Sequence, residues 1–389
     1  MRRSVGWTGC DARAEDWNGI GGDGPETLHP SMRILLTGHD GYIGTVLGPT
    51  LQDAGHDVIG LDAGLFSACE FGHQPPAPPS RRRDVRDIGI MDVAGFDAVV
   101  HLAGLPDGPR GPLDSGPAAR VDAAASVRLA ELAREAGTRR FVFASSCGVY
   151  GAGGGEAVTE ESELNPTTDH GRAKAHAEAG IRALASDSFS PVCLRAGSVY
   201  GVSPRMRFDL TVNNLAAWAV TTGGVQVARD QPAWQPLVHV EDLCRAMLEA
   251  VEAPREAVHD QAFNVGREGD AYQIQDVARV VGEEVGGCHL TMAEGAAPDA
   301  CSGRVSFAKI AERLPGWRPA WTVRDGVREV RDALAGHGLS PAVFEGPRYS
   351  RTARLHLLVE AGALDADLRW TALGDGASAL HAPMPAVAA

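Results

Sequence analysis

Three glycines at intervals of three residues follow the first strongly apolar run of the chain. The run is Arg33–Leu36, and Gly38, Gly41 and Gly44 come after it in the stretch RILLTGHDGYIG. Glycine lets the backbone turn sharply, leaves room for an approaching phosphate, and allows a helix to pack closely on a strand. Apolar residues then recur at near-helical spacing over residues 43–54. This order predicts a pyrophosphate site at a helix N-terminus, although an ordinary turn of an α/β protein would also accept these glycines.

An acidic residue at the end of the next predicted strand, residues 56–62, favours the dinucleotide. Asp62 stands about twenty residues beyond the glycine turn, where a carboxylate hydrogen-bonds the ribose of an adenosine. No Arg or Lys follows Asp62 closely in the sequence. We therefore predict NAD rather than NADP as the cofactor.

Composition excludes several other classes of protein. The chain has 389 residues, 44% of them hydrophobic, and a formal net charge of −14, which opposes a surface for nucleic acid or acidic membranes. Its seven cysteines include no CxxC pair, so we expect neither a disulfide framework nor a metal site, and we expect a reducing, cytoplasmic location. No apolar run approaches the ~20 residues of a membrane-spanning helix.

Strand and helix patterns alternate along most of the chain, which predicts an α/β fold with a doubly wound parallel sheet. In such a sheet the carboxyl ends of the strands share one edge, so Gly38, Asp62, His101 and Ser146 are expected to converge there. The predicted elements after residue 62 are strands at 83–87, 96–104, 140–146 and 191–195, helices at 118–136 and 170–185, and segments 237–240 and 262–266 returning to the main sheet.

The alternation weakens beyond residue 201, which predicts a second, smaller lobe. We expect a disordered leader over residues 1–31, because it is rich in Gly, Asp and Trp without any period. The predicted Rossmann domain covers residues 32–202, with 236–266 returning to it. A C-terminal substrate lobe is expected from 203–235 and 267–370, including an amphipathic helix at 351–361, and a flexible tail over 371–389.

Seven motifs in order resemble the extended short-chain dehydrogenase/reductases, specifically the NAD-dependent epimerase/dehydratase family that modifies nucleotide sugars. The resemblance covers roughly residues 32–330. The motifs are TGHDGYIG at 37–44, HLAG at 101–104, SSCGVYG at 145–151, the helix motif ending at Lys174, LRAGSVYG at 194–201, LVHVEDL at 237–243 and FNVG at 263–266.

The resemblance implies reversible oxidation of a sugar carbon, in which a base takes the hydroxyl proton and the nicotinamide takes the hydride. Ser146 occupies the place of the family's Ser or Thr, and Lys174 that of its lysine. The implied cofactor contacts are Gly38, Asp40, Gly41, Tyr42, Ile43, Gly44, Asp62, Asp84, Val85, Leu102, Ala103, Gly104 and Lys174. The expected substrate contacts are Cys147, Asn213 and Gln235.

Three positions depart from the family pattern at the substrate end. His170 stands where the family has its tyrosine base; imidazole accepts protons near neutral pH but is shorter than tyrosine. The alternative is that His170 is simply a polar residue at the start of a surface helix. Gln235 replaces an arginine that holds the substrate diphosphate, for which Arg229, Arg205, Arg207 or Arg304 could substitute. Gly148 replaces an acid that dehydratases need, so elimination of water is not expected.

We therefore predict an NAD-dependent epimerase or oxidoreductase acting on a nucleotide-linked or modified sugar. The rival hypothesis is a catalytically lapsed NAD-binding paralogue that serves as a partner or sensor protein. Cys147 is expected to be a small filler rather than a nucleophile, because no base is paired with it in the sequence. The family often forms dimers through a four-helix bundle, so the helices at 118–136 and 170–185 are expected to form a homodimer interface.

Overall fold

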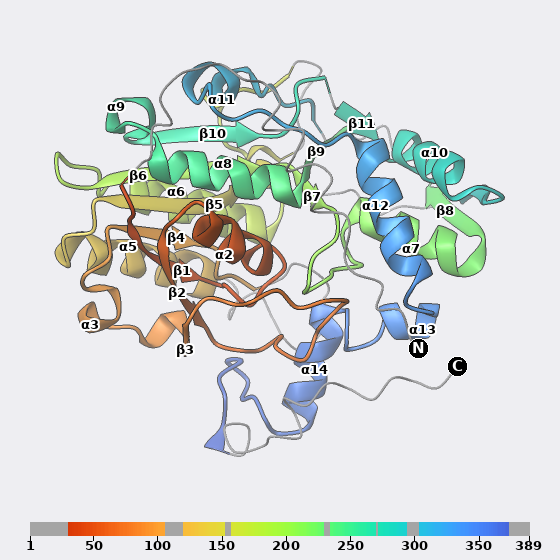
Figure 1. The fold of residues 1–389 in the computed structure, drawn as a ribbon, viewed down its shortest axis with the longest axis horizontal. Coiled ribbons are helices and arrows are strands. Elements are labelled where there is room, and N and C mark those ends of the chain that lie inside the picture. The colour runs from red at the N-terminus through yellow and green to blue at the C-terminus, as the bar shows by residue number, and fades with distance from the viewer. Residues whose placement is uncertain are drawn as a thin grey trace. The chain divides into compact units, whose positions relative to one another are not determined.

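Strands and helices alternate through the first two thirds of the chain as the sequence predicted (Figure 1). The structure is a computed structural model that describes residues 30–105, 120–151, 157–228, 234–269, 271–293 and 303–372. The predicted leader lies outside these residues up to residue 29, and the predicted tail lies outside them from residue 373 on. Met32–Ala389 form one compact unit, which contains the sheets and their helices.

The central layer is a parallel sheet of seven strands in the order β10-β6-β5-β4-β1-β2-β3. Chain order reverses next to β1, which is the switch point of a doubly wound sheet. The predicted fold class is therefore confirmed. Its strands are β1 (Arg33–Thr37), β2 (Asp57–Asp62), β3 (Ser80–Arg82), β4 (Ala98–His101), β5 (Arg140–Ser146), β6 (Ser190–Ala196) and β10 (Gln261–Val265).

The central strands of this sheet bury both of their faces. On β1, Ile34 and Leu36 face one apolar cluster and Leu35 faces another, and all three are fully buried. Removing one such side chain from water stabilises the fold by about 1.5–3 kcal/mol. Helices α2 (Gly44–Asp53) and α8 (Val240–Glu252) cover the first face.

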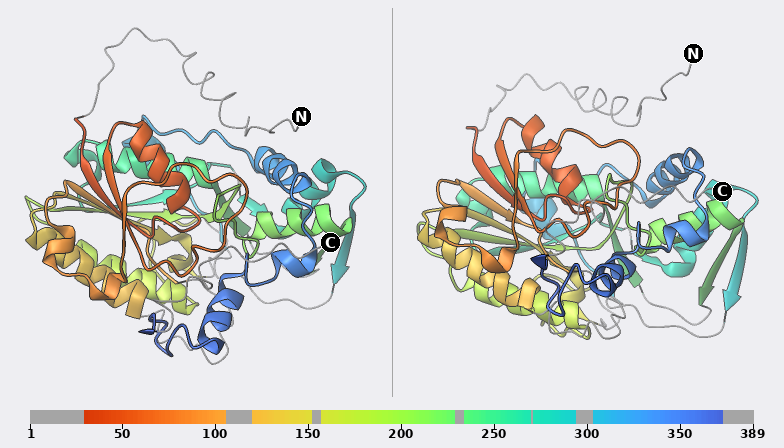
Figure 2. Two further views of the ribbon diagram at one scale, coloured as in Figure 1. Left: turned by 60° about the horizontal axis from the view of Figure 1, so that its bottom comes forward. Right: turned by 90° about the horizontal axis from the view of Figure 1, so that it is seen from below.

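The opposite face of the sheet carries α3 (Ile90–Val93), α5 (Ser126–Glu135) and α6 (Asp169–Arg182), and Figure 2 shows the two helix layers on either side of the strands. A π-helical turn, Arg120–Ala125, leads into α5. It replaces the first part of the helix predicted from residue 118. Short 3₁₀ helices span Val85–Asp87 and Cys147–Tyr150.

The predicted strand at 83–87 is wrong. The strand, β3, ends at Arg82, and Asp84 then accepts a hydrogen bond from the Arg86 backbone N–H at 2.8 Å, which begins a 3₁₀ turn. A side-chain acceptor of this kind offers the backbone an alternative to the sheet.

Segment 237–240 also differs from its prediction, because β9 (Trp234–His239) is not part of the main sheet. It pairs with β7 (Ser198–Tyr200) and β11 (Ala271–Gln273) in a separate three-stranded sheet. The edge beside β6 is taken by β10, so β9 pairs instead with the strand that continues beyond β6. The helix after β9, α8, does return to cover the main sheet.

A third apolar cluster lies among α7 (Thr211–Thr222), α10 (Ile274–Val285) and α12 (Val323–Ala335). The parallel pair β8 (Gly224–Ala228) and β12 (His289–Ala293) flanks it. These elements form the smaller lobe at the right of Figure 1. The remaining helices are α9 (Arg255–Val258), α11 (Ala308–Arg313), α13 (Pro341–Phe344) and α14 (Arg351–Glu360).

Candidate functional site

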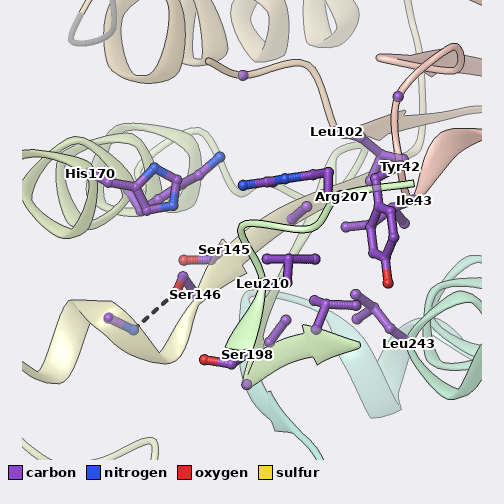
Figure 3. A pocket seen from close by; sticks show the side chains of 18 of the residues that line it. Tyr42, Ile43, Leu102, Ser145, Ser146, His170, Ser198, Arg207, Leu210 and Leu243 are labelled. Atoms are coloured by element: carbon purple, nitrogen blue, oxygen red, sulfur yellow. Dashed lines mark hydrogen bonds between the residues drawn. The ribbon is translucent and has the colours of Figure 1, made fainter. Parts of the chain in front are cut away.

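A cavity of about 560 Å³ opens at the carboxyl ends of the central strands, where the sequence predicted the site. Its wall combines the glycine turn after β1, the ends of β4 and β5, the start of α6 and the loop after β7. Figure 3 shows Tyr42, Ser146, His170 and Arg207 around this space. The walls come from segments far apart in the chain, so only the folded sheet assembles them.

The glycine turn packs so closely against neighbouring backbone that a side chain on Gly38 or Gly44 would not fit. Gly38 has φ +74°, and a Cβ on it would lie 2.7 Å from the Ala103 backbone nitrogen. A Cβ on Gly44 would lie 2.2 Å from the Gly38 carbonyl oxygen. These positions require glycine, and the turn leads directly into the N-terminus of α2, as a dinucleotide pyrophosphate requires.

A smaller cavity of about 110 Å³ adjoins the first and contains Asp62, Asp84, Val85 and Ala103 in its wall. The Asp62 carboxylate accepts hydrogen bonds from the backbone N–H groups of Gly64, at 2.8 Å, and Asp40, at 3.2 Å. These bonds fix the carboxylate at the end of β2. The smaller cavity therefore has the position and the acceptor expected for an adenosine ribose.

Two arginines that the sequence patterns did not indicate, Arg83 and Arg86, also line the smaller cavity. Both have acidic partners: Arg86 binds Asp84 through several short contacts, and Arg83 lies 3.5 Å from Asp92. Because their charges are compensated and Asp62 is nearby, the cavity remains better suited to a ribose hydroxyl than to an extra phosphate.

Asp40, a predicted cofactor contact, does not line either cavity. Its carboxylate forms an ion pair with Arg205 at 2.6 Å. Burial raises the pKa of Asp40, and the Arg205 charge opposes that rise. The other predicted cofactor residues line one cavity or both, among them Tyr42, Ile43, Leu102 and Gly104.

The three predicted catalytic residues, Ser146, His170 and Lys174, line the main cavity together. Ser146 ends β5 and accepts a hydrogen bond from the Gly148 backbone N–H at 3.0 Å, drawn as the dashed line in Figure 3. His170 and Lys174 lie four residues apart on α6, and therefore on one side of that helix. Thr168 caps the helix by accepting a hydrogen bond from the Gly171 N–H at 3.1 Å.

Lys174 is buried and places its ammonium 4.9 Å from the centre of the Phe143 ring. One turn further along α6, Glu178 forms a buried ion pair with Arg195 at 2.7 Å, and Ser145 donates a hydrogen bond to the same carboxylate. This network ties α6 to β5 and β6 directly behind Ser146. It fixes the helix that carries His170 relative to the end of β5.

The predicted substrate contacts divide into two groups. Cys147 and Gln235 line the main cavity, whereas Asn213 is fully buried outside its wall. The Asn213 amide oxygen accepts a hydrogen bond from the Gly201 backbone N–H at 3.0 Å, and its amide nitrogen donates one to the Tyr42 hydroxyl at 3.2 Å. It joins the lobe to the glycine turn.

Of the four arginines considered as substitutes for the family's arginine, Arg207 lines the cavity. Its guanidinium holds Asp209 at 2.6 and 3.0 Å and, in Figure 3, is directed toward the side on which His170 lies. Arg205 pairs with Asp40, Arg304 stacks over Trp234, and Arg229 lies outside the described residues.

Phe66, Ser198 and Arg351 are among the lining residues that sequence reasoning missed. Ser198 lies inside the LRAGSVYG motif, so its place in the chain was a usable signal. Phe66 follows the strand that ends in Asp62. Arg351 gave no signal, because nothing near it in the sequence marks a site.

The sequence profile of the NAD dependent epimerase/dehydratase family matches residues 34–266, more than half of the chain. The chain belongs to this family. The resemblance seen in the motifs is confirmed, and because the family is NAD-dependent, NAD is the cofactor, as Asp62 indicated.

Similar proteins match this chain over about three quarters of its length. The UDP-glucose 4-epimerase of Corynebacterium glutamicum is 27% identical over 312 residues, covering 75% of this chain and 92% of that protein. The enzyme of the same name from Azospirillum brasilense is 28% identical over 337 residues, covering 78% and 92%. Among solved structures, MoeE5 in complex with UDP-glucuronic acid and NAD superposes with a TM-score of 0.66 at 26% identity, covering 78% of this chain and 99% of that one.

Within the part of the chain that the structure describes, no group of three or more His, Cys, Asp or Glu side chains could hold a metal ion. None of the described helices is long and apolar enough to cross a membrane.

Proposed function

We propose that this protein is an NAD-dependent epimerase or related oxidoreductase of nucleotide-linked hexoses, with His170 as the proton acceptor. The observation that carries the proposal is that Ser146, His170 and Lys174 line the same cavity as the glycine turn of the dinucleotide site. A hydroxyl in that cavity would meet a hydrogen-bonding serine and an imidazole beside the position of the cofactor.

Each of the three residues has its own part in the reaction. Ser146 orients the substrate hydroxyl, His170 takes its proton, and Lys174 provides a nearby positive charge and a donor for the nicotinamide ribose. When bound, NAD accepts the hydride that leaves the same carbon and later returns it. His170 returns the proton to the oxygen when the carbon regains the hydride, so the carbon ends at its original oxidation state and no proton is lost over the cycle.

The substrate class is inferred from the cavity and from the relatives. The proteins from C. glutamicum and A. brasilense are named UDP-glucose 4-epimerases, and MoeE5 was solved with UDP-glucuronic acid and NAD. In this chain Arg207 lines the cavity together with Gln235. Gln235 is uncharged and cannot form an ion pair with the substrate diphosphate. We assign this contact to Arg207, because a guanidinium binds phosphate oxygens through paired hydrogen bonds.

The rival function is a lapsed NAD-binding paralogue that acts as a partner or sensor. It is favoured by the departures at His170, Gln235 and Gly148, which all lie on the substrate side while the dinucleotide side is intact. The retained Ser146 and Lys174 favour a working enzyme.

The test is turnover of UDP-glucose and other nucleotide sugars, followed by absorbance of reduced nicotinamide and by NMR of the sugar product. If His170 is the base, His170→Ala should lower the rate by about 10²–10⁴-fold, the usual contribution of a general base. His176→Ala is the matched control, since His176 is exposed on the same helix and does not line the cavity.

His170→Tyr separates the two functions. In a working histidine enzyme it should lower the native rate, whereas in a lapsed epimerase it should create activity on a common nucleotide sugar. An unchanged rate in His170→Ala would end the assignment of this residue, and silence of the wild type across uridine, thymidine, guanosine and cytidine sugars would favour the rival.

A cytoplasmic location accompanies this proposal. The described residues include five free cysteines, four of them buried, which suits a reducing compartment.

A further inference from the structure

The C-terminal segment 351–371 lies beyond the family match and packs against the wall of the cofactor site. Leu355 and Leu358 of α14 and Leu368 join the apolar cluster that covers the sheet on the side of α5 and α6. The sequence assigned this segment to the substrate lobe, whose own cluster does not include these residues. Figure 1 shows α14 at the bottom of the view, to the right of β3 and far from α10.

Direct contacts fix the end of this segment to the smaller cavity. Arg86 donates to the Asp367 carbonyl oxygen at 2.6 Å, and Trp370 donates its indole N–H to the Ala63 carbonyl oxygen at 2.7 Å. Leu368 is 2% exposed and lines the smaller cavity together with Asp62. The segment therefore forms part of the adenosine side of the dinucleotide site.

At the start of the segment, Arg351 carries a buried charge for which the described residues supply no acidic partner. Its side chain lines the main cavity although the residue is only 4% exposed. One guanidinium nitrogen, Nη2, donates to the Arg205 carbonyl oxygen at 2.8 Å. The other, Nη1, is buried and has no hydrogen-bond partner in the described part of the chain, where no carboxylate lies within 4.0 Å of this side chain.

An unpaired buried cation is costly, since neither water nor an opposite charge compensates it. Asp209 is the carboxylate whose charge acts on Arg351, but it is already held by Arg207 at 2.6 Å. The arrangement is therefore incomplete without an anion in the cavity.

The position of Arg351 indicates which anion. Its guanidinium lies 4.8 Å from the centre of the Phe66 ring, and Phe66 lines both cavities. Gly38 and Gly41 also line both cavities, so Phe66 and the glycine turn mark the junction at which the two halves of a dinucleotide meet. The diphosphate of a bound dinucleotide lies at that junction.

We propose that the C-terminal segment completes the dinucleotide site and that Arg351 binds the diphosphate of the cofactor. The glycine turn supplies backbone N–H groups from one side, and Arg351 supplies a guanidinium from an element outside the matched family region. Its Nη1 donates to a phosphate oxygen, and Leu368 closes the adenosine side.

Calorimetric titration of the full-length protein, freed of nucleotide, with NAD tests the proposal. Arg351→Met should weaken NAD binding by about 10- to 100-fold, which is what loss of a hydrogen bond between charged groups produces. Adenosine, which lacks phosphate, should bind the variant and the wild type equally. Arg354→Met is the matched control, because Arg354 is a buried arginine on the same helix that does not line the cavity.

Thermal melts with and without NAD provide a second measurement that needs no turnover, so they remain valid even if the proposed function fails. NAD should raise the melting temperature of the wild type and of Arg354→Met more than that of Arg351→Met. Should Arg351→Met not fold, Arg351→Gln keeps a donor for the Arg205 carbonyl and allows the same comparison.

Three outcomes would overturn the proposal. NAD could bind a folded Arg351 variant as tightly as it binds the wild type, adenosine binding could fall along with NAD binding, or only the affinity for UDP-glucose could fall. The last result would place Arg351 at the diphosphate of the sugar nucleotide instead.

Discussion

The buried ion pair between Glu178 and Arg195 gives a quantitative prediction about the frame behind the site. The two side chains are 2% and 3% exposed, and the Arg195 guanidinium contacts the carboxylate at 2.7 and 3.1 Å. Glu178→Gln removes the charge, leaves Arg195 buried without its counterion and weakens the acceptor for Ser145. Removal of one partner of a buried pair costs about 3–5 kcal/mol of the free energy of unfolding.

That cost can be converted to a melting temperature. The entropy of unfolding is about 2.1 cal/mol/K per residue, which gives about 0.8 kcal/mol/K for a chain of 389 residues. A loss of about 4 kcal/mol should therefore lower the melting temperature by about 5 °C. Circular dichroism melts at neutral pH measure the shift directly.

Two variants control this prediction. Glu161→Gln removes an acid whose side chain is 87% exposed and whose pair with Lys309 is 3.6 Å long, so its effect should stay within about 0.5 kcal/mol. The double variant Glu178→Met/Arg195→Met removes both charges and should lose less stability than Glu178→Gln alone. If Glu178→Gln melts within about a degree of the wild type, or the double variant loses at least as much stability as Glu178→Gln, the reasoning is wrong.

Two further predictions concern acid stability and assembly. Burial raises the pKa of Asp84, but the hydrogen bonds and charge of Arg86 together lower it by more. The pKa of Asp84 in the folded protein therefore lies below its usual value. The stabilisation is present above the unfolded value, about 3.9, and disappears as the pH falls through the folded value. The difference in melting temperature between wild type and Asp84→Asn should therefore be largest near neutral pH and shrink below about pH 4; a difference independent of pH would contradict this. For assembly, we propose a homodimer in which α5 and α6 of each subunit form the interface. Within one subunit these helices already pack as a pair, so closely that a Cβ on Gly180 would lie 2.5 Å from the Val127 side chain. A monomer in light scattering at micromolar concentration would refute the dimer.

The sequence by itself determined the dinucleotide half of the site, because that half is built from local geometry. A strand, a turn that only glycine can adopt and a helix start are encoded in consecutive residues, so Gly38, Gly41 and Gly44 were recognisable without a fold. The same holds for Asp62 at the end of the next strand. Ser146, His170 and Lys174 were found because they sit in motifs whose order resembles the family.

Side-chain competition decided the local features for which the sequence-based prediction is wrong. Asp84 captures the Arg86 backbone N–H, so a predicted strand becomes a 3₁₀ turn. Asn213 uses its amide to bind Tyr42 and Gly201, so a residue expected at the substrate is buried outside the cavity wall. Neither hydrogen bond leaves a periodic pattern in the sequence.

Only the tertiary structure decided where the C-terminal segment lies. Arg351 looks like an ordinary helix residue after the Ser350 cap, and nothing in its neighbourhood marks a ligand. Packing of Leu355 and Leu358 on the central sheet brings it to the cavity that the glycine turn also lines, more than three hundred residues away in sequence. Contacts at such separation depend on which surfaces remain uncovered once the sheet has formed, and that information is distributed over the whole chain.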